Sequence, residues 1–516
     1  MAENCGVSSV HPIASKVGTY ILKRGGNAID AAIAMQLVLA VVHPSAGNLG
    51  GGGFMTVRFK DGRTLVLDFR ETAPALARSD MFTKKIREDI SAKKLAHLSS
   101  GVPGTVAGIF ESLRYAKLSI KELFQPAIEL AEKGYSYHVD LVKTRTEINT
   151  APNVFDGTIK RKEGDAIKQQ DLAATLKRIR DRGGKEFYEG MTAKLIVGEM
   201  QRGGGIMTLQ DLKNYRAIWR KPHSFSYRGY DFASVPLPSA GGIMLHQMLK
   251  MMEPYPVSDY GYGSTAAINL MAEVERRAYR DRAEYLGDGD FSDVPVEMLT
   301  DEKHIKALMK DYFPGKASIS KTLDIVPLNE SNETTHFSII DNEGNAVAVT
   351  TTLNGPYGSG VMVGGAGFFL NNEMYDFYTR PRVGNYPSGG GAANKIEPGK
   401  RMLSSMTPTI VSKDNKVFMV VGTPGGTTIP VSVFQAIVNV IDFKMSASDA
   451  ISRAKFHHKW MPDELDGIFP QDTVKLLQGM GYKLTGKKTI SFLEMIKVVR
   501  PRLIEIASER GSAEGN

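Results

Sequence analysis

The sequence predicts an α+β fold in which antiparallel hairpins are covered by helices. Residues 54–59 and 64–69 flank Lys60-Asp61-Gly62, and residues 334–341 and 345–352 flank Asn342-Glu343-Gly344, so each pair of β-rich runs is expected to form a hairpin. The second connection ends in a glycine, where a three-residue hairpin loop needs a positive φ. An almost wholly apolar helix is expected between Asn27, its N-cap, and Val42, and such a helix packs under a sheet.

Composition and charge indicate an ordinary folded protein. At 516 residues the chain could form one large domain or two to three average ones. Its net charge of +8 does not indicate nucleic-acid binding, because 64 Lys and Arg are interleaved with 56 Asp and Glu. The single cysteine excludes an internal disulfide and a cysteine-based metal cluster. The longest apolar run, Ala31 to Val42, is too short to span a membrane, so no membrane span is expected.

The N-terminal quarter carries a glycine-rich run that does not have the setting of a nucleotide-binding loop. A helix over residues 13–25 precedes the apolar helix, and Gly47 to Gly53 then follows that apolar helix and opens a strand. A dinucleotide loop follows a strand and opens a helix, and a P-loop carries Gly-Lys-Ser/Thr. The run therefore predicts a close approach of backbone to backbone.

The middle of the chain, residues 110–330, is predicted to be mostly helical. Helices are expected at Ile120–Lys133, at Leu172–Arg182 and at Ser264–Leu286, the last with Ser264 as its cap. The segment from Pro327 to Glu333 is expected to be an extended approach to the second hairpin. Beyond that hairpin, a strand from Val417 to Val421 should break at Gly422–Gly426 and restart as a helix near Thr428.

The second hairpin brings two threonines together. Pairing Asp341 with Asn345 fixes a register in which Thr334 lies opposite Thr352, with Cβ atoms about 4.5–5.5 Å apart. By itself this pair is more typical of an ordinary half-exposed sheet than of a catalytic site, since threonine is common in strands.

The residues around this pair resemble a known processing site. Glu333-Thr334-Thr335-His336-Phe337-Ser338, followed by Gly344 to Thr352, is similar to the segment at which γ-glutamyltranspeptidases (glutathione hydrolases), a family of N-terminal-nucleophile hydrolases, cut themselves. The resemblance extends from about Gly6 to about Glu464. It implies a four-layer αββα sandwich with two stacked, mainly antiparallel sheets. It also implies cleavage between Glu333 and Thr334 into a large subunit, 1–333, and a small subunit, 334–516, that form one intertwined domain.

The same resemblance assigns the expected site residues. Arg70, with Ser404 and Ser405, would bind the α-carboxylate of the substrate, and Asn354, Glu373 and Asp376 its α-ammonium group. Tyr386 would belong to a lid over the site. Thr334 would be the nucleophile, steadied by Thr352, and the amides of Gly425 and Gly426 would stabilise the oxyanion. From the residues alone, an arginine at a strand end is more typical of an ordinary ion pair, and an acidic pair on a turn more typical of a solvated surface.

The chemistry implied needs no cofactor and no metal. A threonine freed at an N-terminus carries its own base, an α-amine with a pKa of about 7.7–8.0. His457-His458 lacks the spacing of a zinc site, so no metal centre is expected. Expected partners are glutathione or other γ-glutamyl donors and amino acid or peptide acceptors.

Two other functions and the location remain open from the sequence. A related acylase or poly-γ-glutamate-processing enzyme would share the fold, and an inactive, unprocessed binding protein would share the sequence pattern. Met1 to Gly6 shows no signal-peptide pattern, which favours the cytoplasm. The resemblance instead implies a periplasmic or secreted protein.

Overall fold

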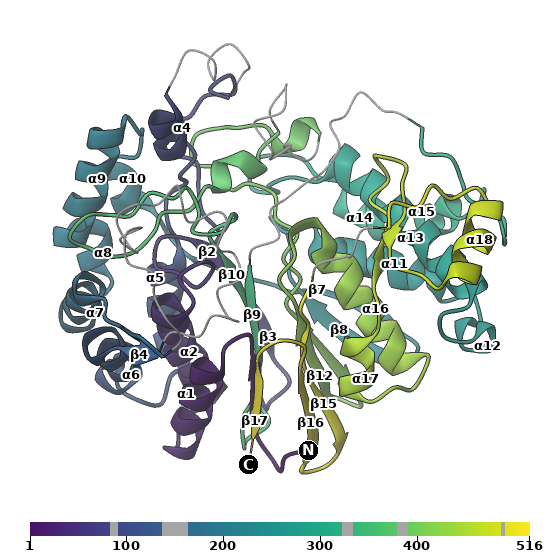
Figure 1. Cartoon of the computed structure of the whole chain (residues 1–516), viewed down its shortest axis with the longest axis horizontal. Coiled ribbons are helices and arrows are strands. Elements are labelled where there is room, and N and C mark those ends of the chain that lie inside the picture. Colours follow the sequence, from purple (N-terminus) through teal and green to yellow (C-terminus); the bar gives the residue numbers. More distant parts are fainter. Residues whose placement is uncertain (83–90, 137–163, 322–333, 379–390, 487–490, 516) are drawn as a thin grey trace.

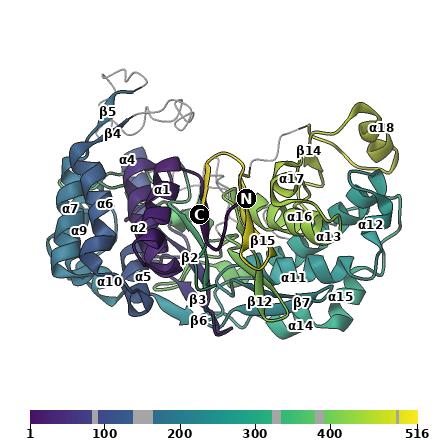
Figure 2. The same ribbon diagram turned by 90° about the horizontal axis from the view of Figure 1, so that it is seen from below.

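Two antiparallel β-sheets lie face to face at the centre of the molecule, with helices on both outer sides (Figure 1). The computed structural model describes residues 1–82, 91–136, 164–321, 334–378, 391–486 and 491–515. The sheets and the two helical layers confirm the predicted αββα sandwich. Figure 2, a view from below, shows the same two helical layers on either side of the strands.

The first sheet has seven strands, all paired antiparallel. In spatial order they are β17 (Ser512–Gly515), β1 (Gly6–Ser9), β9 (Thr335–Ile340), β10 (Ala346–Thr352), β2 (Gly52–Arg58), β3 (Thr64–Asp68) and β6 (Ile218–Arg220). The second sheet has six antiparallel strands. They are β16 (Leu503–Ser508), β15 (Glu494–Arg500), β12 (Lys416–Gly422), β11 (Thr409–Lys413), β8 (Tyr230–Ser234) and β7 (His223–Tyr227).

Helices from the first half of the chain cover the first sheet. They are α1 (Pro12–Lys23), α2 (Ala28–Val42), α4 (Ala92–Leu98), α5 (Thr105–Ser112), α6 (Ile120–Lys133), α7 (Gln170–Arg182), α8 (Lys185–Glu189), α9 (Met191–Gly203) and α10 (Leu209–Asn214). The second sheet is covered by α11 (Gly241–Met252), α12 (Val257–Tyr260), α13 (Thr265–Tyr285), α14 (Val296–Thr300), α15 (Glu302–Leu308), α16 (Ile429–Ile441), α17 (Ala447–Ser452) and α18 (Gln471–Gly479).

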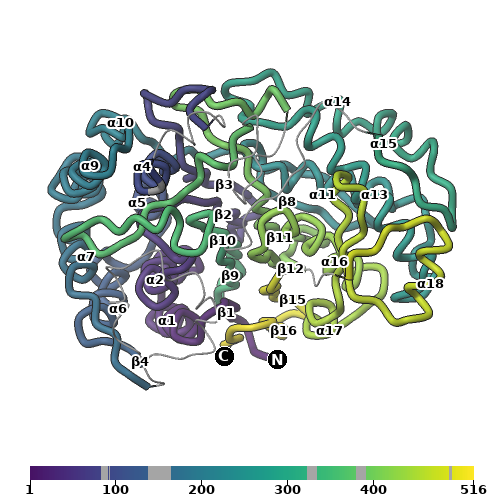
Figure 3. The backbone as a smooth tube through the Cα atoms, turned by 45° about the horizontal axis from the view of Figure 1, so that its top comes forward, coloured from purple at the N-terminus to yellow at the C-terminus, as the bar shows by residue number. Residues whose placement is uncertain are grey.

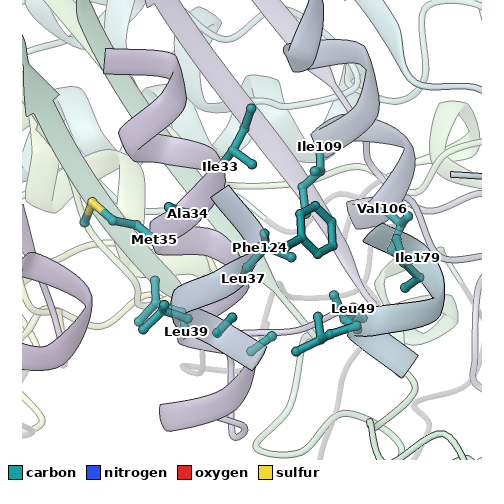
Figure 4. Close-up of a cluster of buried hydrophobic side chains, with 14 of the residues drawn as sticks. Ile33, Ala34, Met35, Leu37, Leu39, Leu49, Val106, Ile109, Phe124 and Ile179 are labelled. Atoms are coloured by element: carbon teal, nitrogen blue, oxygen red, sulfur yellow. The ribbon is translucent and has the colours of Figure 1, made fainter. Parts of the chain in front are cut away.

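Helix α2 forms the centre of the first helical layer, as its apolar sequence predicts. Asn27 caps it by accepting hydrogen bonds from the amides of Ile29 and Asp30, and all its residues are buried. In Figure 4 side chains of α2, α5, α6 and α7 meet in one cluster. Those of Ile33, Leu37, Val106, Ile109, Phe124 and Ile179 are among them.

The space between the sheets is filled differently at its two ends. Ile340, Ala348 and Ile496 belong to an apolar cluster near the chain termini. Strand side chains alternate between faces, so Thr334, His336 and Ser338 share the inter-sheet face of β9 with Ile340. The inter-sheet layer is therefore apolar near the termini and becomes polar toward Thr334.

The predicted register of the second hairpin is confirmed. Ala346 pairs with Ile340 and Thr351 with Thr335, which places Thr352 opposite Thr334. Gly344 has φ 88°, as the three-residue loop requires. The glycine run before β2 also makes the expected close approach, because a Cβ on Gly51 would lie 2.1 Å from the carbonyl oxygen of Thr352.

The expectation of a mostly helical middle region missed three strands of the two large sheets, β6, β7 and β8, and the short strands β4 (Tyr135–Ser136) and β5 (Ala166–Ile167), which pair with each other. Strands β7 and β8 form a hairpin about Arg228 and Gly229, whose φ angles are 47° and 79°. Two successive positive φ angles are typical of a type I′ turn, which usually carries Asn-Gly or Asp-Gly. The Arg228-Gly229 pair is a weaker sequence signal for such a turn than Asn-Gly or Asp-Gly. The predicted extended approach from Pro327 to Glu333 lies outside the described residues.

Segments from the two ends of the chain interleave in the first sheet. Strand β1 lies between β9 and β17, and Gly6 pairs with both Ile340 and Gly515. Figure 3 shows the two termini close together. Within the part of the chain that is described, no helix is long and apolar enough to cross a membrane.

Candidate active site

Two threonine hydroxyls meet at the end of the second hairpin. The Thr334 hydroxyl donates a hydrogen bond of 3.3 Å to Oγ1 of Thr352, and the amide of Asn354 donates one of 2.9 Å to the same oxygen. Thr334 is 7% exposed and Thr352 is 3% exposed. Thr352 is therefore fixed by its neighbours and in turn orients the Thr334 side chain.

A small cavity of about 20 Å³ opens beside Thr334, with room for about one water molecule. Its walls come from segments far apart in the chain: Arg70, Thr334, Thr352, Asn354, Glu373, Asp376, Ser404, Ser405, Met406, Gly426 and Ile429. Nine of the residues proposed from the sequence thus converge on one point. Gly425 directly precedes the lining residue Gly426, whereas Tyr386 and Glu333 lie outside the described residues.

Arg70 is the cationic wall of the cavity. Its Nη2 lies 2.6 Å from Oδ2 of Asp376, and its Nη1 lies 2.9 Å from Oε2 of Glu373 and 3.6 Å from Oε2 of Glu71. The side chain is only 1% exposed, so it is not a solvated strand-end charge. The hydroxyl of Tyr215 donates to the Arg70 carbonyl oxygen at 2.7 Å, which anchors the loop after β3.

The crowding of three carboxyl groups about one guanidinium shifts their protonation. Burial raises the pKa of Glu71 to about 8, against the opposing pull of Arg70. Burial also raises the pKa of Glu373 well above its usual range, and Glu71 and Asp376 add to the effect. Burial lowers the pKa of Arg70, but the three acids outweigh it and raise that pKa. At neutral pH the cluster therefore holds an Arg70–Asp376 ion pair beside two largely protonated acids.

The acidic wall is held by two asparagines. Glu373 and Asp376 lie on one 3₁₀ turn, Glu373–Asp376. The Nδ2 of Asn354 donates to Oδ1 of Asp376 at 3.0 Å, and the Nδ2 of Asn394 donates to the Asp376 carbonyl oxygen at 2.7 Å. Asn394 was not foreseen from the sequence, because it lies in a short 3₁₀ turn, Ala392–Asn394, with no motif around it.

Ser404 and Ser405 line the cavity from a stretch without regular secondary structure. The Ser404 amide donates to the Pro238 carbonyl at 2.9 Å, and the Ala240 amide donates to the Ser404 carbonyl at 2.8 Å. The loop before α11 therefore positions this pair.

The glycine junction after β12, residues 422–426, reaches the cavity through Gly426. Gly425 and Gly426 have φ angles of 137° and 57°, which favour glycine, and a 3₁₀ turn from Gly426 to Thr428 leads into α16. Pro430 lies in the first turn of α16, as predicted. Amides at the start of a helix point outward and stabilise negative charge, so this wall is suited to an oxyanion.

His336 lies behind the nucleophile and was not singled out from the sequence. It is fully buried between the sheets, with Nδ1 2.8 Å from Oγ1 of Thr350 and Nε2 3.1 Å from Oγ of Ser338. Burial lowers its pKa to about 3, so the imidazole is neutral. Its position two residues after Thr334, on the same strand face, was the signal that could have found it.

Among the described residues, no group of three or more His, Cys, Asp or Glu side chains is arranged so that it could hold a metal ion. His457 and His458 are both buried, and His458 Nε2 lies 3.3 Å from Oδ1 of Asp463.

The comparison with known proteins identifies the family. A family model for gamma-glutamyltranspeptidase matches residues 14–515. The chain belongs to the γ-glutamyltranspeptidase family. It is 44% identical over 509 residues to the glutathione hydrolase proenzyme of Escherichia coli (strain K12), a match that covers 95% of this chain and 88% of that protein. The resemblance inferred from motifs is thus confirmed, and the protein is an enzyme of the γ-glutamyltransferase and hydrolase class.

Two solved structures agree with this assignment. The crystal structure of Helicobacter pylori γ-glutamyltranspeptidase is 42% identical with a TM-score of 0.57, and the match covers 60% of this chain and 91% of that chain. The crystal structure of cephalosporin acylase from Bacillus halodurans has a TM-score of 0.86 at 24% identity and covers 99% of this chain and 95% of that chain. The second likeness shows a common fold over almost the whole length.

Proposed function

We propose that this γ-glutamyltranspeptidase cuts itself before Thr334 and then uses the freed Thr334 to cleave the γ-glutamyl amide of glutathione and related donors. The observation that carries the proposal is the convergence of Thr334, Arg70 and Asp376 on one buried cavity. A hydroxyl nucleophile, a guanidinium and a carboxylate are the groups that a γ-glutamyl head group requires, because it has an amide, an α-carboxylate and an α-ammonium group.

In the proposed first stage, Oγ1 of Thr334 attacks the carbonyl carbon of Glu333. The Glu333–Thr334 C–N bond breaks, which leaves an ester and a free α-amine on Thr334. Water then hydrolyses the ester to give fragments 1–333 and 334–516. The match of 91% of the Helicobacter pylori chain to only 60% of this one supports the division, since that chain is correspondingly shorter.

In the second stage, the Thr334 amine accepts the hydroxyl proton while Oγ1 attacks the γ-carbonyl of the donor. The proton passes to the leaving amine as the C–N bond breaks, and a γ-glutamyl ester of Thr334 remains. Thr352 steadies Oγ1, and the amides of Gly425 and Gly426 stabilise the oxyanion. Water or the amine of an amino acid or peptide then attacks the ester and releases Thr334. Loss of one oxyanion donor would typically lower the rate about 100-fold or more.

The donor's head group is assigned to the remaining walls of the cavity. Arg70, Ser404 and Ser405 would bind the α-carboxylate, and Asn354, Glu373 and Asp376 the α-ammonium group. Tyr386 would cover the site. The acidic wall favours a free glutamate head group over the glutaryl group of an acylase substrate, which has no ammonium group for Asp376.

Denaturing electrophoresis and two chromogenic donors test the proposal. The purified chain should separate into two fragments that meet at Thr334, as mass spectrometry would show, and Thr334→Ala should leave one band and no turnover. The wild type should hydrolyse a γ-glutamyl anilide faster than a glutaryl anilide. A single wild-type band after prolonged incubation would overturn the cleavage, and a preference for the glutaryl donor would support the acylase alternative.

The family's usual export makes the periplasm or the extracellular space the proposed location. Activity that remains with the cytoplasmic fraction of the source cells would contradict it.

A further inference from the structure

Arg282 is a buried cation directly behind the cavity. It lies near the end of α13, is 1% exposed, and is one of the largest fully buried side chains. Its Nη2 donates a hydrogen bond of 3.0 Å to Oγ of Ser405. Ser405 lines the cavity whereas Arg282 does not, so the guanidinium faces the site through the serine hydroxyl.

The hydrogen bond determines what the Ser405 hydroxyl can offer a ligand. A hydroxyl has one hydrogen and two lone pairs. Because a lone pair of Ser405 accepts the N–H of Arg282, the hydroxyl hydrogen has to point toward another acceptor. A carboxylate oxygen in the cavity is such an acceptor, and donation from a cation makes the hydroxyl a stronger donor in turn.

The charges at the cavity show why a second cation matters. Arg70 contacts Asp376, Glu373 and Glu71, and its ion pair with Asp376 balances much of its positive charge. A carboxylate that enters beside Arg70 also approaches Asp376, which repels it. A cation on the far side of Ser405 attracts the carboxylate without facing those acids.

We propose that Arg282 is a positioning residue for the donor's α-carboxylate and that it acts through Ser405. The inference rests on the proposed function, because it assumes a donor with a free α-carboxylate at this wall. It adds a specificity determinant on α13, an element that contributes no lining residue to the cavity.

Helix α13 does not depend on Arg282 to stay in place. Asp281 accepts a bond of 2.7 Å from His304, and Arg276 donates one of 2.6 Å to Oγ of Ser320. Gln247 donates a further bond of 2.9 Å to Asp281. Variants at position 282 are therefore expected to fold.

The test compares two donors: a γ-glutamyl anilide and the same anilide with its α-carboxylate converted to a neutral amide. The variants are Arg282→Met, Arg282→Lys, Ser405→Ala and the double variant Arg282→Met/Ser405→Ala. Arg277→Met is the matched control, since it removes another buried arginine of α13 that makes contacts away from the cavity. Rates are normalised to the cleaved fraction seen on denaturing gels.

Arg282→Met should raise KM for the γ-glutamyl anilide about tenfold to a hundredfold, the range expected for a hydrogen bond to a charged group, and change kcat little. It should leave kcat/KM for the α-amide donor nearly unchanged, so that discrimination between the donors falls. Arg282→Lys should retain part of the discrimination, because the charge persists without the planar fork. In the Ser405→Ala background, Arg282→Met should add little.

Equal losses for both donors would overturn the inference, as would additive effects with Ser405→Ala or an equal change of discrimination in Arg277→Met. If Arg282→Met fails to fold, Arg282→Lys still decides: an unchanged ratio of the two donors contradicts the proposal. Failure of the proposed function itself is distinguishable, because the wild type would then not cleave the γ-glutamyl anilide.

Discussion

Replacing Gly422 by alanine should disrupt the contact between the nucleophile strand and the glycine junction. Gly422 ends β12, and a Cβ there would lie 2.2 Å from Cε1 and 2.5 Å from Nδ1 of His336, where ordinary contacts are 3.4–4 Å. The ring has no free space to move into, because it is fully buried and bonds Thr350 on one side and Ser338 on the other.

The cost has two parts. Forcing an extra methyl group into a packed interior costs about 1–3 kcal/mol. If the ring moves enough to break one of its two hydrogen bonds, a buried polar group loses its partner at a further cost of about 1–3 kcal/mol. Gly422→Ala should therefore lower the free energy of unfolding by roughly 2–6 kcal/mol.

A double-mutant cycle isolates the contact. His336→Ala removes the ring and leaves space for the new methyl group, so Gly422→Ala should cost less than about 1 kcal/mol in that background, and the coupling energy should be at least about 1 kcal/mol. Urea unfolding of the uncleaved Thr334→Ala protein measures each free energy on a single chain. Gly198→Ala is the control: a Cβ there meets nothing within 4 Å in α9, and stability should rise by about 0.4–1 kcal/mol.

The same pair should affect catalysis. His336 lies two residues from Thr334, and Gly422 lies three residues before Gly425, so a change at their contact should alter the distance between nucleophile and oxyanion wall. In protein that can cleave itself, Gly422→Ala should lower kcat more than it raises KM. Strictly additive unfolding costs in the cycle, or an unchanged kcat in a destabilised Gly422→Ala protein, would refute this reasoning.

Two further predictions concern a hydroxyl and a buried acid. Thr352→Ala should lower kcat about tenfold or more, because it removes the oxygen that accepts hydrogen bonds from Thr334 and from the Asn354 amide. Thr352→Ser keeps that oxygen and should retain most activity. Equal rates of the two variants in stopped assays would contradict this. Burial raises the pKa of Glu275 to about 8 from 4.5, so the folded state keeps a proton that the unfolded chain releases. Stability from this group is present below about pH 4.5 and is lost as pH rises toward 8. Glu275→Gln should make the decline in urea midpoints from pH 5 to pH 8 shallower without abolishing it, since burial raises the pKa of Glu71 to about 8 as well. An unchanged decline would assign it entirely to other groups.

The second hairpin shows which parts of the fold the sequence could predict. Its register follows from one loop length and one glycine, because a shift by one residue would turn the apolar side chains of β9 away from the core. Helix α2 is likewise determined locally, by the Asn27 cap and an apolar run. Both features depend on neighbours within a few residues. At that range, hydrophobic periodicity and turn residues are strong signals of secondary structure.

Strand order and half-exposed strands could not be predicted in the same way. β7 carries His223, Ser224 and Ser226, and its turn is Arg228-Gly229, so neither composition nor turn gave a clear strand signal. That β1 lies between β9 and β17 depends on contacts nearly the length of the chain apart. Nothing local to residues 6–9 encodes that position.

The site could be assembled from the sequence only by resemblance. Arg70 is separated from Asp376 and Gly426 by hundreds of residues, and each of the three alone is typical of an ordinary surface or turn. Asn394 and Arg282 match no motif, since each contacts a residue of the site and not the expected substrate. His336 lies inside the Thr334 motif but is not one of the site residues that the resemblance assigns. Positioning residues of this kind become visible only when distances between distant segments are known.

The charge of the cavity accounts for the kind of donor that it favours. Arg70 and Asp376 form a buried ion pair, and burial keeps Glu71 and Glu373 largely protonated at neutral pH. A head group with both an α-carboxylate and an α-ammonium group adds no net charge to this buried cluster. A glutaryl group adds an uncompensated negative charge, whose desolvation is not offset. Preference for a zwitterion then follows from charge balance as well as from individual hydrogen bonds, and removing one member of the ion pair should impair folding together with binding.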